Sequence, residues 1–96
     1  MKVEHDVPGR RFVATLPGGQ SAGVLSYSIP AAGRLDFEHV EVPVTLRGRG
    51  LAGRIVEAAC RHAREAGARV IPTCPYVVWW FRQHPEQQDL LGTEEP

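Results

Sequence analysis

The chain has few cysteines, no excess of either charge and no long apolar run. Its two cysteines, Cys60 and Cys74, are too few for the disulfide framework of a small secreted domain. Basic and acidic residues number 11 each, which gives no electrostatic footprint for nucleic acid or an anionic membrane. No segment has the length and apolarity of a membrane-spanning helix or of a signal peptide. We therefore expect a cytoplasmic protein that binds neither nucleic acid nor membrane.

Length and composition fit one globular domain over residues 1–96. Hydrophobic residues make up 43% of the chain and charged residues 23%, as in ordinary globular proteins. Residues 1–10 are interpreted as a lead-in, and residues 92–96 as a frayed tail. A chain this short has to place most of its apolar residues in a single core.

Alternating apolar residues predict three strands, at 11–16, 21–29 and 34–42. Turn-forming residues, including Pro and Gly, separate them at 17–20 and 30–33. Three strands joined by short turns form an antiparallel meander.

The third predicted strand changes the face on which its apolar residues lie. Leu35 and Phe37 fall at odd positions, whereas Val40 and Val42 fall at even ones. A strict period of two cannot place both pairs on one face. A β-bulge near Glu38 or the residue after it would restore a common face. The alternative is a strand end that is buried on both faces.

The apolar spacing then predicts a helix, a strand and a second helix. Residues 50–66 carry apolar side chains at helical spacing, and Gly67 is well suited to end that helix. A short strand follows at 68–73, and Pro75 can open a final helix. The predicted order is β-β-β-α-β-α, a mixed sheet of the α+β class.

The loop before the long helix reads Gly-Arg-Gly-Leu-Ala-Gly at 48–53, which matches the dinucleotide pattern G-x-G-x-x-G. A Rossmann fold also needs a strand leading directly into the first glycine, a second βα unit and an acidic residue about 20 positions later. Here Pro43 and the residues after it separate the strand from Gly48, and no Asp or Glu ends the next strand. The pattern is therefore not a dinucleotide fingerprint.

The same glycines predict a different anion site. The first amides of a helix lack intrahelical acceptors and lie at the positive end of its dipole. Gly48 and Gly50 leave room for a ligand there, and Arg47 and Arg49 add positive charge, so the turn suits a pyrophosphate. The alternative is an ordinary strand-to-helix turn. No spacing of His, Cys, Asp and Glu is typical of a metal site, and we expect no metal.

Residues 40–52 resemble the acetyl-coenzyme A (acetyl-CoA) loop of the GNAT N-acetyltransferase superfamily, whose pattern is [RQ]-x-x-G-x-[GA]. Arg47, Gly50 and Ala52 fill its three fixed positions. The segments H-x-E-V-P, RGRGLA, P-x-C-P-Y-V and RQHPE…DLL together resemble the small stand-alone GNAT-like proteins. The resemblance runs from Phe12 to Leu91.

This resemblance implies a minimal GNAT fold with acetyl-CoA as co-substrate. The strands at 34–42 and 68–73 would run parallel and splay apart, with the helix at 50–66 as the crossover. The pantetheine arm would pair with main chain near Val40–Val42, and the diphosphate would rest on the amides of residues 47–52. The implied coenzyme-binding residues are Val40, Glu41, Val42, Arg47, Gly48, Arg49, Gly50, Leu51 and Ala52.

Two residues are candidates for the chemistry of acetyl transfer. His39 could take a proton from an amine near neutral pH; the alternative is a histidine packed on the sheet. Cys74 precedes a helix start, and could accept the acetyl group or protonate the leaving thiol. The alternative is that Cys74 is a small buried residue without a catalytic role. The family resemblance favours a catalytic role. GNAT proteins usually place a leaving-group tyrosine on the final helix, but we do not assign that role to Tyr76.

The sequence therefore predicts an acetyl-CoA-dependent N-acetyltransferase whose amine acceptor and oligomeric state it does not disclose. One alternative is a coenzyme A-binding module without catalysis. Another is a protein-interaction domain that uses Trp79 and Trp80, since two adjacent tryptophans on a helix cannot both face one core.

Overall fold

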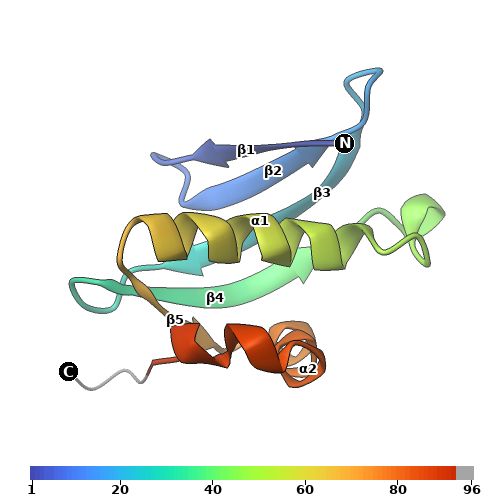
Figure 1. Ribbon diagram of the computed structural model, residues 1–96. Coiled ribbons are helices and arrows are strands. Elements are labelled where there is room, and N and C mark those ends of the chain that lie inside the picture. Colours follow the sequence, from blue (N-terminus) through green and yellow to red (C-terminus); the bar gives the residue numbers. More distant parts are fainter. Residues whose placement is uncertain (93–96) are drawn as a thin grey trace.

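The computed structural model describes residues 1–92 as a five-stranded mixed sheet with two helices (Figure 1). The four antiparallel strands are β1 (Lys2–Asp6), β2 (Arg11–Thr15), β3 (Ser21–Ser28) and β4 (Arg34–Glu41). The fifth strand, β5 (Arg69–Pro72), pairs with β4 in parallel. The helical elements are η1 (Val44–Leu46), α1 (Leu51–Glu65), α2 (Pro75–Gln83) and η2 (Pro85–Leu90).

The predicted α+β class, with its meander and one parallel strand pair, is confirmed, and the structure adds a strand at the start. β1 lies where a lead-in was predicted, and it pairs with β2. Val3 packs against the core and His5 stacks on Phe12, whereas Lys2 and Glu4 are exposed. Such a short strand with one inward aliphatic residue gives a weak periodic signal. The observed order is β-β-β-β-α-β-α.

The predicted β-bulge is confirmed at Glu38. Ser26 of β3 is opposite His39, and Tyr27 is opposite Phe37, so Glu38 is the extra residue of β4. The apolar residues on both sides of the bulge therefore share the face that meets the core. The alternative of a strand end buried on both faces is wrong, because Glu38 and His39 are exposed.

Helix α1 lies across one face of the sheet (Figure 1). Its inward stripe includes Ile55, Val56 and Ala59, each fully buried. Burial of an aliphatic side chain of this size stabilises the fold by about 1.5–3 kcal/mol. Cys60 lies in the same stripe, and burial raises the pKa of its thiol to about 12, so this cysteine belongs to the core as predicted. Neither helix within residues 1–92 is long and apolar enough to cross a membrane.

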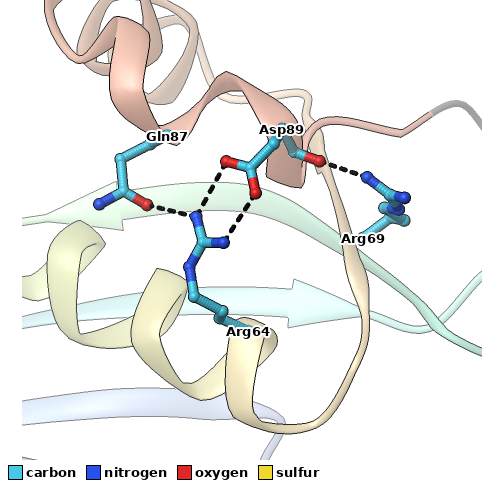
Figure 2. A network of polar contacts seen from close by, with 4 residues as sticks. All are labelled: Arg64, Arg69, Gln87 and Asp89. Atoms are coloured by element: carbon cyan, nitrogen blue, oxygen red, sulfur yellow. Dashed lines mark hydrogen bonds and ion pairs between the residues drawn. The ribbon is translucent and has the colours of Figure 1, made fainter.

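The carboxyl end of α1 is joined to η2 by a polar network (Figure 2). Arg64 Nη1 lies 2.7 Å from Asp89 Oδ2, and Arg64 Nη2 lies 3.0 Å from Asp89 Oδ1. Gln87 also accepts a hydrogen bond from Arg64, and the Asp89 carbonyl accepts one from Arg69. Of the predicted tail, Gly92 donates a hydrogen bond to a β5 carbonyl, and residues 93–96 lie outside the described residues.

Candidate functional site

Strands β4 and β5 separate just after Phe37. The parallel register ends where Phe37 is opposite Pro72, and the Cys74 amide donates a 3.0 Å hydrogen bond to the Phe37 carbonyl. The chain then enters α2, whereas β4 continues to Glu41. Within residues 1–92, the part of β4 beyond Phe37 therefore has no neighbouring strand on its β5 side.

A cleft of about 540 Å³ opens at this separation, a size typical of small-molecule sites. It is lined by β4, by the loop that leads into α1 and by one face of α2. The predicted residues that line it are His39, Val40, Glu41, Val42, Arg47, Gly48, Gly50, Leu51 and Ala52. Arg49 is exposed and is not among the lining residues.

The amino end of α1 meets the cleft without a side-chain cap. The helix begins at Leu51, and its N-cap is Gly50, with φ 74° in the left-handed region. No side chain caps this end, and the first turn holds no acidic residue. The first-turn amides of a helix have no intrahelical acceptor and carry the positive end of the dipole. This end of α1 therefore suits an anionic group in the cleft.

The loop before α1 is held against the end of β4. Arg47 Nε lies 3.3 Å from the Val42 carbonyl oxygen and donates a hydrogen bond to it. Pantetheine was predicted to pair with main chain near Val40–Val42, and Arg47 is the partner of the Val42 carbonyl here. Gly48 has φ 82°, a conformation that side chains rarely adopt, and a Cβ there would meet open space. Gly48 and Gly50 therefore allow the positive φ angles of the loop and also leave room for a ligand.

His39 lies at the cleft rather than in the core. Its side chain is 59% exposed, and its Nε2 lies 2.9 Å from Glu41 Oε1. The carboxylate of Glu41 therefore orients the imidazole. The alternative of a histidine packed on the core face is wrong. An accessible imidazole held by a carboxylate can act as a general base.

Cys74 lies where β4 and β5 separate, which we call the splay point, but its side chain is buried in the core. It is the N-cap residue of α2, it is 6% exposed, and it belongs to the main hydrophobic cluster. It is not among the residues that line the cleft. A catalytic role for Cys74 stays a prediction.

Tyr76 and Trp79 line the cleft, and the sequence did not assign either to it. Their ring centroids lie 5.6 Å apart on one face of α2. Burial raises the pKa of Tyr76, so its hydroxyl is protonated at neutral pH. Trp80 is 3% exposed and Trp79 is 51% exposed, which confirms that the two tryptophans face different surroundings. The spacing of Tyr76 and Trp79, three apart directly after the splayed strand, is the signal that could have found them.

Within residues 1–92, no group of three or more His, Cys, Asp and Glu side chains is placed to hold a metal ion. The cleft instead combines a helix amino terminus, an open strand edge, an imidazole and a phenol. These groups can hold a phosphorylated ligand and transfer protons beside it.

The fold and cleft define an acetyltransferase-type α+β domain. Residues 11–90 match the family described as GCN5-related N-acetyl-transferase, and the chain belongs to this family. It is 34% identical to the protein NATD1 of Bos taurus over 90 residues, which cover 94% of this chain and 80% of NATD1.

Two solved structures share the fold. The chain is similar to a GCN5-like protein from Staphylococcus aureus, with a TM-score of 0.74 and 20% identity over 98% of this chain and 91% of that chain. It is also similar to Rv2747 from Mycobacterium tuberculosis, solved in complex with CoA, with a TM-score of 0.62 and 20% identity. That match covers 79% of this chain and 47% of Rv2747.

Proposed function

We propose that this protein transfers the acetyl group of acetyl-CoA to a primary amine. The uncapped amino end of α1, open to the cleft, carries the proposal because it suits a diphosphate. Family membership and the CoA bound to a similar fold support it.

The coenzyme would lie along the cleft from α1 to the splay point. Its diphosphate would accept hydrogen bonds from the amides of residues 47–52, with Arg47 and Arg49 adding charge. The pantetheine amides would pair with the open edge of β4 at Val40 and Glu41, in the manner of an added strand. To use the Val42 carbonyl as well, the ligand would have to displace Arg47 from it.

The transfer needs a deprotonated amine and a protonated leaving group. His39 takes the proton of the acceptor ammonium, and the amine nitrogen attacks the thioester carbon. A C–N bond forms, the C–S bond breaks, and the leaving thiolate takes a proton. The acylated nitrogen loses its second proton, which restores the group that protonated the thiolate. Tyr76 can supply that proton, because its hydroxyl is protonated and lines the cleft. The buried position of Cys74 favours this direct route over an acetyl-cysteine intermediate.

The test is CoA release from acetyl-CoA in the presence of pooled primary amines. Turnover with at least one amine, lost in the Gly50→Val variant, is the expected result. Saturable acetyl-CoA binding without turnover across a broad panel would favour a non-catalytic coenzyme module. Calorimetry that detects no heat with acetyl-CoA would favour a protein-interaction domain and overturn the proposal.

A further inference from the structure

The carbonyl of Val42 points into the cleft from the end of β4. Successive main-chain carbonyls of a strand point to alternate edges. The Glu41 carbonyl points toward β3, because a Cβ built on Gly23 would lie 2.6 Å from its oxygen. The Val42 carbonyl therefore points to the opposite edge, which faces the cleft. It is among the main-chain groups with which the pantetheine arm would pair under the proposed function.

A short turn brings Arg47 back to this carbonyl. The Leu46 amide donates a 2.8 Å hydrogen bond to the Pro43 carbonyl, and the Leu46 side chain is buried, which closes η1 against the core. Arg47 is the next residue, and its Nε donates its hydrogen bond to the Val42 oxygen at 3.3 Å. Arg47 and Val42 both line the cleft. The guanidinium therefore occupies an acceptor on the edge of β4 along which the coenzyme would lie.

An anion can replace this hydrogen bond. Its length exceeds the usual N–H···O distances of about 2.7–3.2 Å, and Arg47 is exposed. Within residues 1–92, Arg47 forms no ion pair with a carboxylate. A phosphate would offer the guanidinium a negative charge and two parallel hydrogen bonds, where the carbonyl accepts one. A phosphate at the amino end of α1, which opens on the same cleft, would therefore draw the Arg47 side chain away from Val42.

We infer that Arg47 makes the cleft selective for thioesters that carry a phosphate, an inference that rests on the proposed function. A pantetheine thioester without phosphate has to compete with the guanidinium for the Val42 carbonyl. Acetyl-CoA carries a diphosphate that binds the guanidinium, and this leaves the carbonyl to the pantetheine arm. Arg47 is thus a specificity-determining residue, because one side chain opposes the pantetheine arm alone and stabilises the complete coenzyme.

The experiment follows backbone amide shifts by NMR while S-acetyl-pantetheine or acetyl-CoA is added. The test variant is Arg47→Met, which keeps an aliphatic side chain without the guanidinium. The matched control is Arg49→Met, because Arg49 is an exposed arginine of the same loop that does not line the cleft. The dispersion of each amide spectrum shows whether the variant is folded.

The two ligands should respond to Arg47→Met in opposite directions. S-acetyl-pantetheine should bind about threefold more tightly, because it gains a carbonyl that was occupied, an effect of about one net hydrogen bond. Acetyl-CoA should bind about threefold more weakly or worse, because its diphosphate loses a charge-assisted contact. Arg49→Met should bind S-acetyl-pantetheine like the wild type.

Three results would overturn the inference. If acetyl-CoA binds the wild type but Arg47→Met does not strengthen S-acetyl-pantetheine binding, or does not weaken acetyl-CoA binding, the selectivity is wrong and the proposed function stands. An equal gain for S-acetyl-pantetheine in Arg47→Met and Arg49→Met would assign the gain to net charge instead of the Val42 carbonyl. If acetyl-CoA shifts no amide of the cleft in the folded wild type, the proposed function fails and the inference fails with it.

Discussion

At the scale of residues, three side chains near the splay point differ in what they can reach. His39 is exposed and held by Glu41, Tyr76 lines the cleft, and Cys74 is buried beside it. Proton transfer needs contact with the reacting atoms, which the first two positions allow. Under the proposed function, this difference in access favours His39 and Tyr76 over Cys74 as the groups that transfer protons.

Replacing His39 by Gln should lower kcat by about 100-fold or more, since positioned general bases contribute factors of 10² to 10⁴. Acetyl-CoA affinity should stay within about twofold of the wild type, because the side chain acts on the acceptor. Steady-state kinetics and calorimetry measure the two quantities. The Glu41→Gln variant keeps the imidazole, so its kcat should decrease less than that of His39→Gln. An unchanged kcat in His39→Gln would remove His39 from the mechanism.

Replacing Tyr76 by Phe removes one hydroxyl and keeps the ring. The variant should lose about tenfold or more in kcat, because the leaving thiolate loses its proton donor. Tyr27→Phe is the matched control: that hydroxyl lies 2.6 Å from His5 Nε2 and away from the cleft. Equal kinetics in the two variants would show that the Tyr76 hydroxyl is not the acid.

The glycine-relieved turn and the bulge in β4 leave local signals in the sequence, and both were predicted from them. The coenzyme-binding residues of β4 were predicted from the family resemblance, and they line the cleft. The sequence did not place Tyr76 and Trp79 at the cleft, for a different reason. Helical spacing places two side chains on one face, but it does not say whether that face meets the core or a cavity. The contact of His5 with His62, whose ring centroids lie 4.3 Å apart, likewise depends on tertiary packing.

At the scale of elements, the close approach of β3 to β4 and α1 positions the open edge of β4. Gly23 of β3 has φ 138°, and a Cβ there would lie 2.6 Å from the Glu41 carbonyl oxygen and 2.9 Å from Ile55 Cδ1. Only glycine allows the strand and helix to meet at this distance. The period-two pattern predicted β3 but could not show this contact, because Glu41 and Ile55 are distant in sequence.

The Gly23→Ala variant should be destabilised by about 2 kcal/mol or more, from backbone strain together with overpacking. Gly19→Ala is the control, because Gly19 also has a positive φ of 85° but has open space around it. Urea unfolding compares the two. Similar free energies of unfolding would show that the contact at Gly23 relaxes at little cost.

At the scale of the whole molecule, α1 joins two separate regions. Its amino end opens on the cleft, and its carboxyl half holds β1 through a cluster of His5, Phe12, Tyr27 and His62. Burial, and secondarily the charge of His62, lower the pKa of His5 below its ordinary value of 6.5. The folded protein therefore favours the neutral form of His5.

This shift makes the stability of the fold depend on pH. Because the folded pKa lies below the unfolded one, the contribution of His5 is complete above pH 6.5 and is lost as the pH falls through the lowered pKa. The thermal midpoint of unfolding should therefore decrease as the pH is lowered from 7 to 5. A His5→Phe variant keeps an aromatic ring on Phe12 and should show a flatter profile. If the thermal midpoint changes equally with pH in the wild type and in His5→Phe, the pH dependence does not come from His5.

The central claim is that unpaired amides at the start of α1 hold the coenzyme diphosphate. Calorimetry with acetyl-CoA tests it in the wild type, Gly50→Val and Gly67→Val. Gly67 matches Gly50 closely: its φ is 68° against 74°, a Cβ would meet open space at either, and it follows the other end of α1. We predict that Gly50→Val weakens acetyl-CoA binding at least tenfold while Gly67→Val binds like the wild type. Equal affinity in two folded variants would contradict the account.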